Sequence, residues 1–181
     1  SLGNTVFAYS RDRPALVVPP YFRALNDPRV TSVLGGAGFP LKTQGNDLDF
    51  YRQQKYLDYG SDMRLASGLE ARYIIAEAQL KQGNPAAAVA LIAERAAAGS
   101  AVDGDDFADT PDDVLTELLD QRARDFYLEG QHMGTWLRNG YETPYVYRPG
   151  TAYYAEAGST VGTQTCLVVP DDEVLNNPNF P

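Results

Sequence analysis

The residues of this sequence best suited to chemistry are three charged side chains in helix-forming segments, Glu77, Arg95 and Arg122. Arg122 interrupts a stripe of apolar residues that recurs every three or four positions between Val114 and Phe126. A buried guanidinium needs a carboxylate partner, because removing that partner costs about 3–5 kcal/mol. Such a cluster can grip a ligand or brace helices against one another. The apolar setting favours the brace, and we predict an ion-pair network of Glu77, Arg95 and Arg122.

Tyrosine is unusually frequent, with 12 Tyr against 7 Phe and 1 Trp. A tyrosine ring offers a flat apolar face with a hydroxyl at its rim, which suits the recognition of sugars or of other proteins. On this basis we predict Tyr51, Tyr145, Tyr147 and Tyr153 as ligand-contacting residues. The alternative for each of them is packing within a loop-rich protein.

Charge and composition exclude several classes of function. A net charge of -9 provides no electrostatic basis for binding nucleic acid or an anionic membrane surface. A single cysteine, Cys166, rules out an internal disulfide, and a single histidine, His132, argues against a metal centre or hydrolase triad. Hydrolysis by paired carboxylates needs two acids about 5–9.5 Å apart across a cleft, whereas the acids here cluster in helix starts and linkers. We therefore expect no cofactor, no metal and no catalysis.

The helices that would position these residues lie in a predicted core of residues 61–140. Apolar periodicity predicts a helical hairpin over 62–99, turning at Gly83, with Ser67 and Glu70 as a capping box where the regular part begins. Helical structure is also predicted over 110–139, with Thr110 as the cap and a shorter continuation after a sharp turn at Gly130. The fold class is therefore mainly α.

The flanking segments carry less periodic sequence. Residues 1–60 contain many prolines and glycines and are predicted to be irregular, with helical character only over 20–26. Residues 141–181 are predicted to form an irregular, tyrosine-rich C-terminal lobe with a short apolar strand over 165–170. We interpret all three segments as parts of one domain.

The order of several short motifs carries a family resemblance. The hairpin resembles a tetratricopeptide unit at Ala76-Glu77-Ala78, Leu80, Gly83-Asn84 and Ala87, although only one such unit is visible. The chain as a whole resembles the C-terminal portion of the SusD/RagB family of outer-membrane glycan-binding lipoproteins. The matching motifs are Asp27-Pro28-Arg29, Lys55-Tyr56, Glu70 with Tyr73 through Ala78, Arg95 before Ala98-Gly99, Arg122 through Glu129-Gly130 to Leu137-Arg138, and Val169-Pro170 with Glu173 and Asn177-Pro178-Asn179.

This resemblance implies a mostly helical SusD-like domain whose earlier helices and lipidated N-terminal cysteine precede Ser1. It implies a non-catalytic protein at the cell surface of the outer membrane. There it would bind oligosaccharides or other nutrients and deliver them to a SusC-like TonB-dependent transporter. The alternative interpretation is a tetratricopeptide-like adaptor that binds another protein through its helical hairpin and has no glycan role.

Overall fold

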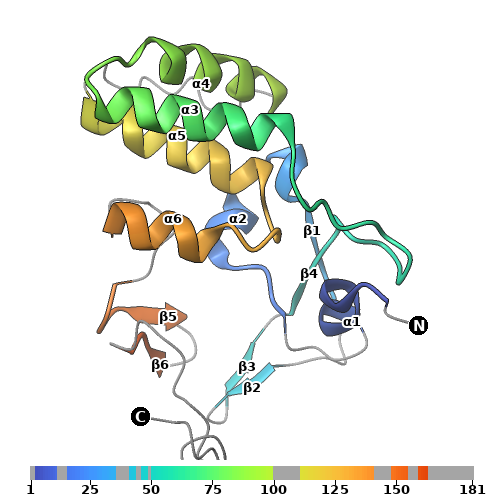
Figure 1. Cartoon of the computed structure of the whole chain (residues 1–181). Helices are drawn as coiled ribbons and strands as arrows, with labels where there is room; N and C mark the ends of the chain where they lie inside the picture. Colours follow the sequence, from blue (N-terminus) through green and yellow to red (C-terminus); the bar gives the residue numbers. More distant parts are fainter. Residues whose placement is uncertain are drawn as a thin grey trace, which may run out of the picture. The chain divides into compact units, whose positions relative to one another are not determined.

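The fold is taken from a computed structural model that describes residues 3–11, 16–35, 41–43, 46–48, 50–99, 111–140, 148–154 and 159–162. The chain divides into two compact units, Ser1–Val146 and Tyr147–Pro181. The described part is mainly helical, which confirms the predicted class (Figure 1). No described helix has the length and apolar character that a membrane crossing requires.

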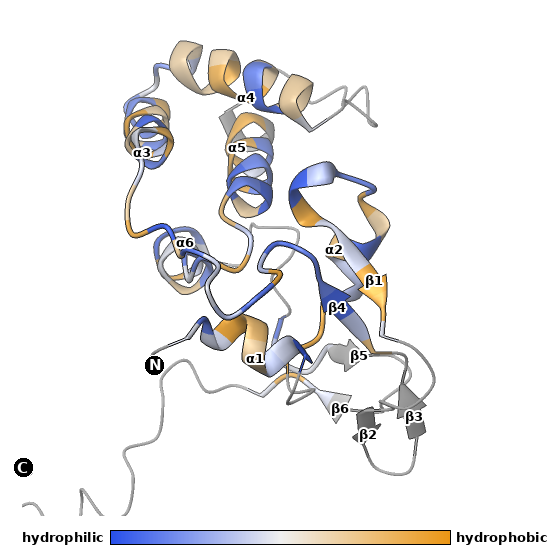
Figure 2. Cartoon of the chain, turned by 90° about the vertical axis from the view of Figure 1, so that its right-hand side faces the viewer, coloured by the Kyte–Doolittle hydropathy of each residue, from blue (hydrophilic) through white to orange (hydrophobic). Residues whose placement is uncertain are grey.

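Three helices form the main core of the first unit. They are α3 (Gly68–Lys81), α4 (Ala86–Ala98) and α5 (Pro111–Asp125), which lie side by side in Figure 1. Figure 2 shows that α4 is hydrophobic apart from one hydrophilic part, and α4 contacts both α3 and α5. The buried residues that hold the three helices together are Tyr73, Ala76 and Leu80 from α3, Ala88, Leu91 and Ile92 from α4, and Val114 and Leu118 from α5.

The first helix of the hairpin is shorter than the predicted range. Residues 62–67 are not helical, and α3 begins at Gly68 because the Ser67 side chain accepts a hydrogen bond from the Glu70 backbone N–H at 3.1 Å. The turn into α4 passes through Gly83, whose φ of 84° lies in the left-handed region that glycine tolerates.

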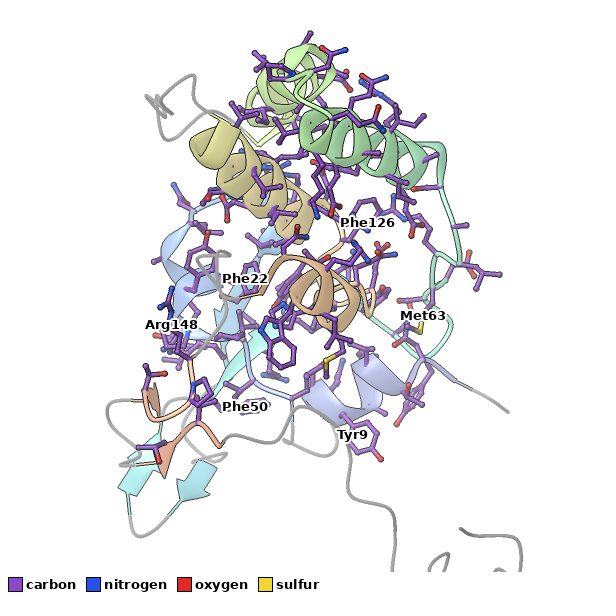
Figure 3. All side chains as sticks on the ribbon, turned by 60° about the vertical axis from the view of Figure 1, so that its left-hand side comes forward. Tyr9, Phe22, Phe50, Met63, Phe126 and Arg148 are labelled. Carbon is purple, nitrogen blue, oxygen red and sulfur yellow. The ribbon has the colours of Figure 1, made fainter. Side chains whose placement is uncertain are left out.

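The predicted helical range 110–139 is divided into two helices. Helix α5 ends at Asp125, and α6 (His132–Asn139) begins after a turn. Leu128 and Gly130 adopt φ values of 60° and 75°, which a continuous right-handed helix cannot contain. Phe126 at the start of this turn closes the core, with its ring edge-to-face against Tyr73 at 5.7 Å between centroids (Figure 3).

Short elements make up the N-terminal segment, which contributes to a second, smaller core. They are α1 (Thr5–Arg11), α2 (Pro20–Ala24), the 3-10 helix η1 (Pro28–Val30) and the strands β1 (Ser32–Leu34) and β4 (Tyr51–Gln53). Strands β1 and β4 pair antiparallel, with Ser32 opposite Gln53. The small core joins Val18, Val30 and Tyr127, with Phe22, Leu25, Tyr51 and Leu128 packed against it.

Two further strand pairs complete the described structure. In the first unit, β2 (Leu41–Thr43) pairs antiparallel with β3 (Asn46–Leu48). In the second unit, β5 (Ala152–Tyr154) pairs antiparallel with β6 (Ser159–Thr160). The strand predicted over 165–170 lies outside the described residues.

Candidate functional site

The candidate site is an open depression of about 460 Å³ on the N-terminal part of the first unit. This volume falls within the range of about 300–1,000 Å³ that small-molecule sites typically occupy. Its lining comes from α2, η1, the turn between them and the start of β1. The lining residues are Phe22, Arg23, Asn26, Asp27, Pro28, Val30, Thr31 and Ser32.

Local sequence explains the shape of this wall. Pro19 and Pro20 start α2, which ends after one turn, and Asn26 then adopts a φ of 48°, a conformation that asparagine tolerates better than most residues. Asp27 caps η1, because its carboxylate accepts a hydrogen bond from the Arg29 backbone N–H at 2.8 Å. The chain therefore turns twice within a few residues, and the depression lies between the turns.

The depression combines an aromatic residue with free polar groups. Within the described part of the chain, the side chains of Arg23, Asn26, Thr31 and Ser32 make no hydrogen bond to protein. Phe22 contributes apolar surface, and its ring packs against Tyr127 at 5.0 Å between centroids. Free donors and acceptors beside an aromatic ring are the groups that a sugar needs for its hydroxyls and its apolar face.

Tyr51, a predicted ligand residue, lies next to this depression but is already covered. Its half-buried ring packs in the small core, and the Arg23 guanidinium carbon lies 4.3 Å from the ring centroid. A cation–π contact of this kind contributes about 0.5–1 kcal/mol at an exposed site. Tyr51 can therefore orient Arg23 toward the depression, whereas direct stacking on a ligand would require Arg23 to move away.

The other predicted ligand residues are not brought to this depression. Tyr145 and Tyr147 lie outside the described residues. Tyr153 belongs to β5 in the second unit, where only its backbone position is described. The depression itself was missed by the sequence analysis, although its helical segment over 20–26 and the Asp27-Pro28-Arg29 motif were both singled out.

The charged residues predicted as one network fall into two separate clusters. Arg122 donates to Glu77 at 3.3 Å, and Glu77 also accepts from Asn139 at 3.0 Å. Arg95 instead donates to Asp125, at 2.8 Å from Nε and 2.7 Å from Nη2. The prediction that Arg95 joins Glu77 is wrong, because Arg95 in the last turn of α4 reaches the end of α5, while Glu77 faces α6.

Asp125 is the residue on which the cluster that contains Arg95 converges. Besides Arg95, it accepts from Arg29 Nη1 at 3.0 Å and from the Tyr73 hydroxyl at 2.7 Å. Burial alone would raise the pKa of Asp125, but the hydrogen bonds from Arg95 and Tyr73 and the charge of Arg29 hold the pKa below its usual value. An acid kept ionised by two arginines serves as a structural anchor.

A neighbouring set of contacts ties the remaining motifs to the helices. Lys55 donates to the Glu129 carboxylate at 2.6 Å and to the Tyr127 carbonyl at 2.7 Å. Gln131 accepts from Arg122 at 2.9 Å and donates to Glu70 at 2.7 Å. Residues that carry the family resemblance thus take part in each of these sets of contacts, around Asp125, Glu77 and Glu129. We call Asp27, Arg29, Arg95 and Asp125 the Asp125 brace.

Comparisons with known proteins add nothing to the geometry of this site. Comparisons of the chain with protein-family models, with curated proteins and with solved structures found no match. Among the described residues, no group of histidine, cysteine, aspartate and glutamate side chains is arranged to hold a metal ion. The interpretation of the depression therefore depends on its own geometry.

Proposed function

We propose that this chain is a non-catalytic binder of oligosaccharides of the SusD/RagB kind, in which it corresponds to the C-terminal portion. The observation that carries the proposal is the open depression, whose lining includes Phe22 and the side chains of Arg23, Asn26, Thr31 and Ser32, which make no hydrogen bond within the described part of the chain. The depression is large enough for a sugar ring, and its lining includes both polar and apolar residues. One ring of an oligosaccharide would place its hydroxyls against these groups.

The packing of the motifs supports the family assignment. Motifs far apart in sequence, such as Asp27-Pro28-Arg29 and the segment from Arg122 to Glu129, contact each other through the Asp125 brace. A set of short motifs is more specific when its members form one connected structure than when they are scattered. In this proposal α3 and α4 are a single tetratricopeptide-like hairpin that supports the binding face.

The biological setting follows from the same proposal. A binder of this kind sits at the cell surface of the outer membrane and delivers its ligand to a SusC-like TonB-dependent transporter. Its recognition groups are one neutral amide, two hydroxyls and one guanidinium, which suits capture of a ligand better than cleavage. The ligand would be an oligosaccharide or a related polar nutrient.

A panel of oligosaccharides titrated into the full chain tests the proposal. We expect saturable binding of at least one member, and a weaker affinity for the Asn26→Ala variant, because a hydrogen bond to a neutral group contributes about 0.5–1.5 kcal/mol. Arg72→Ala is the matched surface control, since Arg72 is an exposed arginine of α3 outside the depression. Absence of saturable binding across the panel would contradict the proposal.

The alternative function, a protein-binding adaptor, is favoured by one separate observation. Ile74 and Ile75 on α3 are each 53% exposed, and Met133 and Leu137 on α6 are 52% and 65% exposed. Exposed apolar side chains on helices can form protein interfaces. An adaptor would show no saturable response to any oligosaccharide, and its partner binding would weaken on Ile75→Ser.

A further inference from the structure

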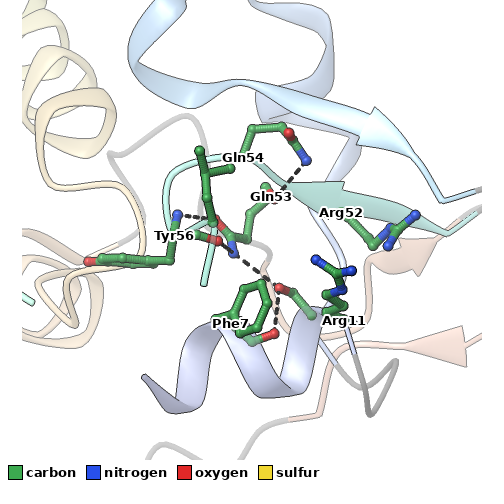
Figure 4. Close-up of a pocket in the computed structure, with 8 residues that line it drawn as sticks. Phe7, Arg11, Arg52, Gln53, Gln54 and Tyr56 are labelled. Carbon is green, nitrogen blue, oxygen red and sulfur yellow. Dashed lines mark hydrogen bonds between the residues drawn. The ribbon is translucent and has the colours of Figure 1, made fainter. Parts of the chain in front are cut away.

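A second, smaller hollow lies between α1 and the segment that follows β4. It measures about 110 Å³, and its lining includes Phe7, Arg11, Arg52, Gln53, Gln54 and Tyr56 (Figure 4). A water molecule occupies about 30 Å³ in the liquid, so this hollow accommodates a group of only a few heavy atoms. A carboxylate or a sulfate fits that size, whereas a whole sugar ring does not.

The charge of the hollow is opposite to that of the protein. Among the described residues, its lining holds two arginines and no acidic residue, in a chain whose net charge is -9. Two guanidinium groups beside one small hollow repel each other, and an anion between them would remove that repulsion. The hollow is therefore a local exception to an acidic molecule.

The two arginines also lack the partners that other arginines of this chain have. Arg29, Arg95, Arg122 and Arg124 each form an ion pair with a carboxylate. Among the described residues, no carboxylate pairs with Arg11 or Arg52. Arg52 donates to the Gly35 carbonyl at 3.3 Å, and its Nε is buried with no hydrogen-bond partner. An anion in the hollow would give both guanidinium groups the acidic partner that the other four arginines have.

Gln53 gives the hollow a rigid floor. Its buried amide donates to the Ser10 hydroxyl at 3.1 Å and to the Tyr56 carbonyl at 2.8 Å, and it accepts from the Tyr56 backbone N–H at 2.7 Å. These bonds, drawn in Figure 4, join α1 to the chain after β4. These bonds fix the backbone next to Arg11 and Arg52, so the two positions from which the guanidinium groups extend are set before any ligand arrives.

We propose that this hollow binds the anionic substituent of an acidic oligosaccharide, a uronate carboxylate or a sulfate ester. The saccharide part of this inference rests on the proposed function, whereas the anion-binding part stands on the hollow alone. Two arginines suit a carboxylate or a sulfate because each guanidinium presents several N–H donors in one plane. Neutral sugars would gain nothing from the hollow.

Calorimetric titration of the full chain with matched neutral and uronate-containing oligosaccharides tests the inference. We expect tighter binding of the uronate ligand, about a 10-fold weaker affinity of that ligand for Arg11→Ala or Arg52→Ala, and no change for the neutral ligand. The advantage of the uronate ligand should fall as salt is raised, because exposed charges are screened. Arg72→Ala should change neither affinity.

A charge reversal and a free anion make the test decisive. Arg11 is exposed, so Arg11→Glu should fold and should abolish the preference for the uronate ligand. Equal affinities of wild type and Arg11→Glu for the uronate ligand would overturn the inference. Sodium sulfate and sodium glucuronate separate the two proposals. If they bind the wild type but not Arg11→Glu while no neutral oligosaccharide binds, the hollow is an anion site and the oligosaccharide proposal fails.

Discussion

Arg95 contacts both carboxylate oxygens of Asp125, with Nε 2.8 Å from Oδ2 and Nη2 2.7 Å from Oδ1. This two-point contact joins the end of α4 to the end of α5. Arg29 joins a third segment, η1, to this contact. Its Nη1 lies 3.0 Å from Asp125 Oδ1, and its Nη2 lies 2.7 Å from Asp27 Oδ2. The wall of the candidate site, which contains Asp27, is thereby fixed to the helical core.

Replacing Asp125 with alanine should destabilise the protein strongly. The change leaves Arg29 and Arg95 without their shared partner and removes the acceptor of the buried Tyr73 hydroxyl. Breaking a buried pair by removing one partner costs about 3–5 kcal/mol, and we expect a loss of that size in the free energy of unfolding. Urea denaturation followed by circular dichroism measures it.

The exposed pair of Arg72 and Glu94 provides the control. Their side chains are 50% and 47% exposed, and solvent screens their attraction. Arg72→Ala should leave the urea midpoint unchanged. If Asp125→Ala and Arg72→Ala shift the midpoint equally, the Asp125 brace has no special role in the fold.

The stability of the protein should fall in acid because of the Asp125 carboxylate. The pKa of Asp125 is lowered in the folded protein, so the unfolded chain binds its proton more readily. This contribution is complete above the ordinary aspartate pKa of about 4 and is lost as pH falls below that value. The free energy of unfolding of the wild type should therefore drop between pH 5 and pH 3. Asp125→Asn should show a shallower pH dependence, and identical slopes for both proteins would refute this assignment.

Gly99 should not tolerate a side chain, although its backbone conformation is ordinary. A Cβ at this position would lie 2.5 Å from Arg29 Nη2 and 2.8 Å from Asp27 Oδ2. Gly99→Ala should displace the pair and destabilise the protein by about 1–3 kcal/mol, the usual cost of overpacking. Gly68→Ala is the matched control, because nothing lies within 4 Å of its Cβ position and alanine favours a helix. A Gly99→Ala protein as stable as Gly68→Ala would contradict the close packing of this pair.

Tyr51 should affect ligand binding through Arg23. Tyr51→Leu keeps an apolar side chain but removes the ring over which Arg23 lies. We expect a loss of about 2- to 5-fold in oligosaccharide affinity, corresponding to a cation–π contact of about 0.5–1 kcal/mol. In a double-mutant cycle the Tyr51 effect should vanish once Arg23 is alanine. Additive effects would show that Tyr51 contacts the ligand independently.

The sequence predicted the main helices but not the carboxylate that pairs with Arg95. Apolar periodicity and the Ser67 cap carry enough local information to locate α3, and Gly83 and Gly130 mark turns by their conformational freedom. The choice of Asp125 over Glu77 as the partner of Arg95 depends on which helix ends meet. That choice is set by packing among α3, α4 and α5 and cannot be read from spacing along one helix.

The candidate site was harder to anticipate for a related reason. Nothing in the sequence distinguishes the polar residues of the depression, which are Arg23, Asn26, Thr31 and Ser32. The two turns around Asn26 and Asp27 bring them to one depression. The frequency of tyrosine directed attention to aromatic rings instead. Tyr51, one of the predicted rings, does lie beside the site. The groups that can meet a ligand there are largely polar.

Isothermal titration calorimetry with wild type and Arg23→Ala, using the tightest oligosaccharide of the panel, tests the central claim most directly. The proposal predicts saturable binding to the wild type and about 10-fold weaker binding to Arg23→Ala, because the variant loses a hydrogen bond from a charged group. Equal affinities for the two proteins would contradict the assignment of the depression as the oligosaccharide site.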